Sequence, residues 1–367
     1  MATSSLIETQ RALAPVLTVG PAREDSVQTV LWYGDRKGRR DSVAREYEAV
    51  AAHGAGLIDC SWLAKLRITG PERLTFLQGM ISQDVASLKP GDSRHAAMLD
   101  PSGHFVAELY VHALDDMVLI ETDTRAMLKF HQTLTRYLIM EDAELEDVSA
   151  DWAVISLQGS HAAETTASLL NIPVLPNLVN TPIKYGGSAG FAVGRSHSRY
   201  GGVDIWLPVD AAAEFWRASS AEIGVVGELA VEILRIEAGI PRWGTELDSS
   251  VLLLEADLDD AVSFGKGCYI GQEIVARIHA RGHTNRSLRA FLFEPGAPVD
   301  PGNKLFPENG MAEREVGRVT SVVDSPLTGG CLGFGYVRRE YTEDGTELMS
   351  IASTGAPCPG VVRTFPL

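Results

Sequence analysis

The sequence predicts an α+β protein in which two mixed lobes precede a C-terminal domain made of β-strands. Apolar residues recur with helical spacing in Thr124–Tyr137 and Leu229–Ala238, and short apolar runs typical of strands flank these stretches. Beyond about residue 285 helical spacing is nearly absent, and short apolar runs alternate with Gly/Pro turns. This second pattern is typical of a small β-barrel or β-sandwich.

The elements of the first lobe follow one another in a recognisable order. A strand over Ala64–Ile68 precedes a turn that enters a helix, with Pro71 suited to the first helical turn. Further strands are expected at Ala96–Leu99, Phe105–Ala113 and Met117–Glu121, then the helix over Thr124–Tyr137 and a short acidic strand at Ala143–Asp147. This is the order of a ferredoxin-like unit, and a similar order recurs from Ala153 to Ile223.

These patterns predict a division of the chain. Residues 25–65 and 149–265 are expected to form one discontinuous α+β lobe, and residues 66–148 a ferredoxin-like lobe. Residues 285–367 are expected to form the β-barrel, with 266–284 as a connecting loop and helix. The first 25 residues are expected to be loosely ordered, followed by a strand at Val27–Tyr33 and a helix at Asp41–Gly54.

Composition excludes several function classes. The net charge of −16 argues against a general nucleic-acid binder, because phosphate binding needs a basic surface. The four cysteines are far apart in the sequence, so reduced thiols and a cytoplasmic location are expected. There is no convincing signal peptide and no run of 18 apolar residues, so no membrane association is expected.

The octapeptide Lys266-Gly267-Cys268-Tyr269-Ile270-Gly271-Gln272-Glu273 contains the cysteine with the most reactive surroundings. A cation lies two residues before Cys268, and a helix is expected just beyond it, over Gln272–Ala280. Both features favour a thiolate. The alternative is that Cys268 is a small buried apolar residue, as free cysteines often are.

Other charged side chains and potential metal ligands in this region give weaker evidence of a functional site. Cys268, His279 and His283 offer three metal ligands without an evident fourth, so no bound metal is expected. Glu273 and Arg277 are spaced as an i,i+4 pair, worth only ~0.2–0.5 kcal/mol. Arg277, Arg281 and the arginines that follow could instead form a cationic strip for an acidic ligand or partner.

The octapeptide resembles the signature of the YgfZ-type folate-binding proteins, which are relatives of the aminomethyltransferase (T-protein) of the glycine cleavage system. The resemblance covers roughly residues 25 to 365, and its further blocks are Gly56–Ser61, Gly70–Arg73, Phe76–Gly79, Leu234–Pro241, Glu255–Leu258, Arg277–His283 and Gly317–Ser321.

The resemblance implies a three-lobed, cloverleaf-like ring that binds tetrahydrofolate or a one-carbon derivative. It also implies service to iron–sulfur client or assembly proteins, with Cys268, as a functional thiol, and Lys266 as the catalytic residues. The residues expected at the folate are Tyr200, Arg235, Glu237, Gly267, Tyr269, Gln272, Glu273 and Arg277. Arg235 would suit the glutamate tail and Glu237 the pterin ring, although an i,i+2 pair on a helix points to different sides.

Two departures separate the chain from true aminomethyltransferases. The resemblance places Ala107, followed by Glu108, where the transferases have an acidic pair whose first member is catalytic; alanine cannot handle a proton. Tyr200 stands where the transferases have a Glu that holds the pterin. A folate-dependent aminomethyltransferase or demethylase is nevertheless the alternative function, and a scaffold with a vestigial pocket is the third.

Overall fold

The computed structural model describes residues 4–14, 16–21, 28–308, 314–352 and 355–367. By the packing of its backbone the chain divides into two compact units. Unit 1 comprises residues 1–98, 106–231 and 260–270, and unit 2 comprises residues 99–105, 232–259 and 271–367. Residue 25, where the discontinuous α+β lobe was predicted to begin, and Val27, where the first strand was predicted to begin, lie outside the described residues. The division into three domains stays a prediction.

One sheet of unit 1 has five strands in the order β5-β6-β7-β4-β8. Its strands are β4 (Ala64–Thr69), β5 (Ser93–Leu99), β6 (Phe105–Ala113), β7 (Val118–Thr122) and β8 (Glu144–Asp147). Helix α3 (Arg73–Met80) follows β4, and α4 (Thr124–Tyr137) follows β7. The register pairs Lys65 with Glu121 and Tyr110 with Glu121, so polar side chains of three strands share one face.

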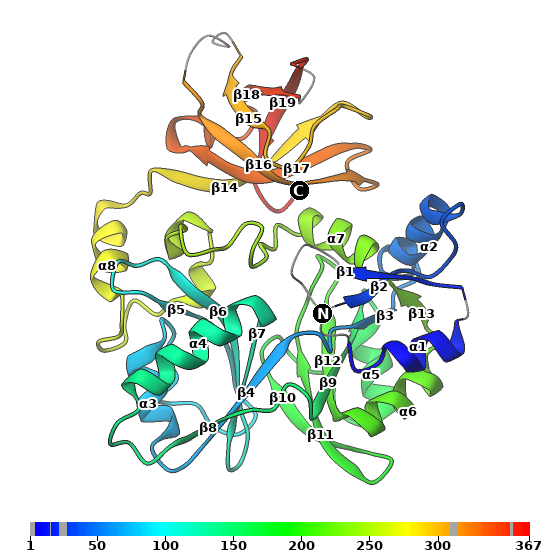
Figure 1. Cartoon of the computed structure of the whole chain (residues 1–367), viewed down its shortest axis with the longest axis vertical. Coiled ribbons are helices and arrows are strands. Elements are labelled where there is room, and N and C mark those ends of the chain that lie inside the picture. The colour runs from blue at the N-terminus through cyan, green and yellow to red at the C-terminus, as the bar shows by residue number, and fades with distance from the viewer. Residues whose placement is uncertain (1–3, 15, 22–27, 309–313, 353–354) are drawn as a thin grey trace. The chain divides into compact units, whose positions relative to one another are not determined.

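The second sheet of unit 1 has six strands in the order β10-β11-β12-β9-β3-β13. Its strands are β3 (Gly56–Asp59), β9 (Trp152–Gln158), β10 (Asn180–Tyr185), β11 (Ser188–Gly194), β12 (Gly202–Pro208) and β13 (Gly224–Val226). Helices α5 (Ala162–Leu170) and α6 (Val209–Ser219) both pack against β9 and β12 (Figure 1). In both sheets the elements follow one another along the chain in the order strand, helix, three strands, helix and strand. The second sheet has β3 as an additional strand.

The beginning of the chain is more ordered than the sequence predicts. Helix α1 (Ile7–Leu13) packs against α6, and the side chain of Leu6 is fully buried. Gln10 donates to the Asp59 carboxylate at 2.7 Å, and Ser4 also donates to it. The remaining elements here are β1 (Thr18–Pro21), β2 (Gln28–Trp32) and α2 (Arg39–Ala51). The prediction of a loosely ordered start is wrong because this short helix is stabilised by tertiary burial, which local composition does not report.

Unit 2 is built around a closed barrel with the strand order β14-β17-β16-β15-β18-β19 (Figure 1). The strands are β14 (Arg286–Phe293), β15 (Lys304–Pro307), β16 (Gly317–Ser325), β17 (Gly330–Arg338), β18 (Glu347–Ile351) and β19 (Pro357–Arg363). The predicted C-terminal barrel is confirmed. Strands β15 and β19 escaped prediction, because β15 is very short and β19 contains prolines and a glycine.

Two helices carry the motifs singled out in the sequence. Helix α7 (Glu228–Glu237) begins in unit 1 and ends in unit 2. Helix α8 (Gln272–Arg281) lies in unit 2 and ends at Gly282, whose φ of 75° suits a left-handed helix cap. Short 3-10 turns occupy Leu253–Glu255, Asp259–Ala261 and Arg339–Tyr341. Within the described part of the chain, no helix combines the length and apolar content needed to span a membrane.

Candidate functional site

Lys266 fastens residues 266–270, the signature segment, to the end of helix α3. Its ammonium donates to the carbonyl oxygens of Gln78 and Ile81 at 2.7 Å and of Gln83 at 2.9 Å. Carbonyls at a helix C-terminus lack intrahelical partners, and an ammonium has three N–H donors. Because all three donors are used, the structure gives Lys266 an anchoring role; its predicted catalytic role stays a prediction. Burial lowers the pKa of this amine to about 8.

Cys268 is exposed, and it lies on a segment held at both ends. Lys266 secures one end, and the Ile270 N–H donates to the Gly79 carbonyl at 3.3 Å on the other. The Tyr269 ring centroid lies 5.0 Å from the Lys266 ammonium, within cation–π range. The other three cysteines are buried. The interpretation of Cys268 as a small buried apolar residue is therefore wrong.

Helix α8 begins at Gln272, as predicted, with Gly271 as its N-cap. Tyr269 and Ile270 separate Cys268 from that cap, so the thiol does not belong to the first turn of the helix. The predicted ion pair between Glu273 and Arg277 is present at 2.9 Å, and both side chains are largely exposed. These side chains, with Gly267 and Gln272, remain predicted folate contacts.

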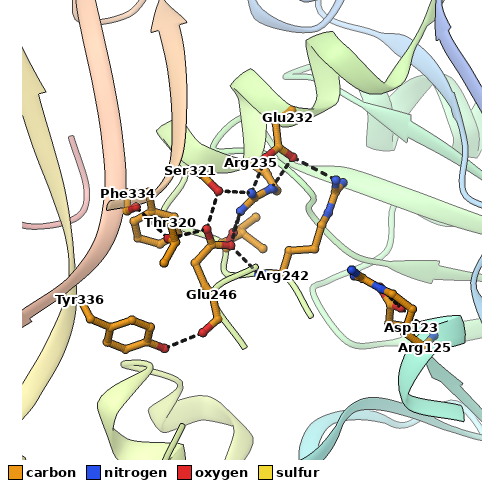
Figure 2. Close-up of polar contacts among 11 residues, drawn as sticks. Asp123, Arg125, Glu232, Arg235, Arg242, Glu246, Thr320, Ser321, Phe334 and Tyr336 are labelled. Atoms are coloured by element: carbon orange, nitrogen blue, oxygen red, sulfur yellow. Dashed lines mark hydrogen bonds and ion pairs between the residues drawn. The ribbon is translucent and has the colours of Figure 1, made fainter. Parts of the chain in front are cut away.

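Arg235 lies in a buried ion-pair network of unit 2 (Figure 2). It donates to both carboxylate oxygens of Glu232, to Glu246 at 2.9 Å, to the Ile240 carbonyl at 2.9 Å and to Ser321 at 3.0 Å. A guanidinium has five N–H donors, and all five are used. Burial acts to lower the pKa of Arg235, but the two carboxylates outweigh it and raise that pKa. The predicted binding of a folate tail by Arg235 stays a prediction, and it would require some of these contacts to be exchanged for the ligand.

Glu237, two residues further along α7, is also buried. Its carboxylate accepts from the Ser325 hydroxyl at 2.6 Å and from the Leu327 N–H at 3.2 Å, at the turn that joins β16 to β17. As expected for an i,i+2 pair, Arg235 and Glu237 have different partners. Glu237 therefore fixes a barrel turn, and its predicted role at a pterin stays a prediction. Tyr200 is half-buried in the turn before β12 and stays a predicted ligand contact.

A charged cluster around the buried His95 ring in unit 1 escaped prediction. The His95 ring donates to Glu108 at 2.9 Å and to Asp260 at 3.0 Å. Burial acts to lower the pKa of His95, but the hydrogen bonds to Asp260 and Glu108 outweigh it and raise the pKa to about 9. The ring is therefore a cation at neutral pH. Asp260 is 165 residues away in sequence, and no local pattern could have joined it to His95.

Tyr110 connects this cluster to a second group of charges. Its ring is stacked on His95, with centroids 4.5 Å apart, and the Arg195 guanidinium lies 3.4 Å from the ring centroid. Arg195 in turn pairs with the buried carboxylates of Glu121 and Asp204. The alternation Glu108-x-Tyr110-x-His112 on an otherwise apolar strand was the one sequence signal of this polar face.

Ala107 is fully buried on β6, on the opposite face from Glu108. Neither residue offers a free carboxylate: Ala107 has none, and the Glu108 carboxylate is held by His95. No cluster of three or more potential metal ligands occurs among the residues that the structure describes.

Comparison with known proteins defines the class of protein. The chain superimposes on the crystal structure of the glycine cleavage system aminomethyltransferase T from Bartonella henselae with a TM-score of 0.84, covering 97% of this chain and 95% of that one, at 21% identity. The fold is thus that of a glycine cleavage T-protein.

The sequence gives the family. Residues 23–266 match the GCVT N-terminal domain, and residues 286–367 match the glycine cleavage T-protein C-terminal barrel domain. A protein named Aminomethyltransferase from Chlorobium luteolum is 29% identical to this chain, over 88% of this chain and 90% of the relative. Another of the same name, from Desulforamulus reducens, is 28% identical, over 84% of this chain and 85% of the relative. The chain belongs to the glycine cleavage T-protein family.

Proposed function

We propose that this protein binds tetrahydrofolate, or a one-carbon derivative of it, and takes part in folate-dependent one-carbon transfer. The observation that carries the proposal is family membership across nearly the whole chain, with relatives named Aminomethyltransferase. The sequence had favoured an iron–sulfur role over a transferase, and the names of the relatives favour the transferase.

The residue that limits this proposal is Ala107. The resemblance places it at the position of the catalytic acid, and a methyl group cannot orient an amine or exchange a proton. Glu108 does not substitute for it, because its carboxylate accepts from the His95 cation. Transfer from an aminomethyl donor would therefore depend on another acid, and we expect turnover well below that of a T-protein with the acid in place.

The test has two stages. Titration calorimetry with tetrahydrofolate measures binding, and absence of binding would refute the proposal. A methylene-transfer assay with an aminomethyl-loaded carrier protein then measures turnover. Turnover supports the transferase, whereas binding without turnover supports the second candidate below. The Ala107→Asp variant, checked first for folding, shows whether restoring the acid raises the rate.

The second candidate is a YgfZ-type accessory factor that serves iron–sulfur proteins. It is favoured by the exposed thiol of Cys268 on a segment fastened by Lys266. The experiment is a deletion strain in which the activity of iron–sulfur enzymes is measured after complementation with wild type, Cys268→Ala, Lys266→Ala and, as a control, the exposed Lys184→Ala. Full activity with Cys268→Ala would remove the thiol from this function.

A further inference from the structure

Unit 2 contains a cavity of about 580 Å³ lined by barrel strands and by a neighbouring segment of the chain. Strands β14, β16 and β17 form one wall, and residues from the 245–251 segment form another. Glu246, Thr320 and Tyr336, which line it, are drawn in Figure 2. The lining includes four arginines: Arg286, Arg314, Arg318 and Arg338. In a chain of net charge −16 this is an unusual concentration of cations.

The strand register places three of these arginines on one face of the barrel wall. Arg286 on β14 lies directly opposite Arg338 on β17, and Arg318 on β16 lies opposite Tyr336, two residues before Arg338. Residues opposite each other, and residues two apart on one strand, project from the same face. Like charges directly across a sheet repel and destabilise the pair, so this arrangement favours an anion between them.

Of the three acids that line the cavity, only Glu315 pairs with one of these arginines, Arg318. Glu246 is already held by Arg235 and by the hydroxyls of Thr320 and Ser321. Glu315 is shared between Arg318 and Lys304, each at 3.1 Å.

The remaining acid, Asp248, accepts from the N–H and hydroxyl of Ser250 in a local turn. Arg286 pairs with Glu255 at 3.0 Å and lies 4.8 Å from the Tyr336 ring centroid. Within the described residues, the side chains of Arg314 and Arg338 have no hydrogen bond or ion pair. The cavity therefore keeps at least two guanidinium groups for a ligand.

We propose that this cavity binds a small polyanion, with carboxylate or phosphate groups held by Arg314 and Arg338 and by the free edge of Arg318. Guanidinium groups recognise both anions through paired, charge-assisted hydrogen bonds. The cavity volume exceeds that of a single carboxylate, so the ligand carries more than one anionic group. The site lies within unit 2 and is independent of folate binding.

Titration calorimetry on the full chain tests this with two probes, pyrophosphate and a tri-glutamate peptide, at low and high salt. We expect binding of at least one probe, weakened by salt. Arg338→Gln should lower the affinity about tenfold, and Arg314→Gln with Arg338→Gln about a hundredfold. The matched control is Arg339→Gln, whose exposed side chain does not line the cavity. Circular dichroism checks that each variant is folded.

The preferred probe identifies the anion, and either preference supports the proposal. Failure of both probes to bind at low salt would overturn it. The proposal would also be overturned if the double variant bound the probe with the affinity of the wild type. The same holds if Arg339→Gln lost as much affinity as Arg338→Gln.

Discussion

Replacing Lys266 with methionine removes the charged donor that fastens the signature segment while keeping the length of the side chain. Three carbonyl oxygens, those of Gln78, Ile81 and Gln83, then lose their donor. A hydrogen bond to a charged group contributes ~1.5–3 kcal/mol. Since Lys266 is only half-buried, water can replace part of this. We therefore expect the local opening free energy of the segment to fall by ~2–3 kcal/mol in total.

Amide hydrogen exchange measures this local free energy directly. The reporter is the Ile270 N–H, which donates to the Gly79 carbonyl. A loss of ~2–3 kcal/mol corresponds to exchange about 30- to 150-fold faster, since ~1.4 kcal/mol is tenfold. Lys184→Met, at an exposed position of β10, serves as the control. If Ile270 exchanged at the same rate in both variants, the anchoring role of Lys266 would be refuted.

Three further predictions concern buried charges and the exposed thiol. Arg235→Met leaves the buried carboxylate of Glu246 without its cation and Glu232 with Arg242 alone, so urea unfolding should show a loss of ~3–5 kcal/mol; a loss under ~1 kcal/mol would contradict the network. The folded pKa of His95, about 9, lies above its unfolded value near 6.5. Its stabilisation, on the order of 3 kcal/mol, is thus complete below pH 6.5 and lost as pH rises through 9. The stability difference between wild type and His95→Gln should shrink over that range, and a constant difference would disprove the assignment. Cys268→Ser should change stability by less than ~0.5 kcal/mol and abolish the single fast reaction with a thiol reagent, because the other described cysteines are buried.

Periodicity predicted the regular elements well where one face is apolar. The helix expected over Thr124–Tyr137 is α4 with the same bounds, and the helix expected from Gln272 is α8. Strands β15 and β19 and helix α1 were missed, because their local patterns are weak and tertiary burial stabilises them.

The candidate site was predicted less completely. The sequence singled out Cys268, and the structure leaves its thiol exposed. It could not show that Arg235 has every donor occupied by its own chain, because the partners come from a loop and a barrel strand. It also gave no sign that His95 meets Asp260.

By itself, the sequence determined the fold class, the family resemblance and the position of the candidate functional thiol, because each follows from local periodicity or from contiguous motifs. Only the tertiary structure decided which charges are free to meet a ligand. Whether a charged side chain can bind a ligand depends on whether residues distant in the chain already pair with it. Arg235 pairs with Glu246, whereas Arg338 lines the cavity without such a partner among the described residues.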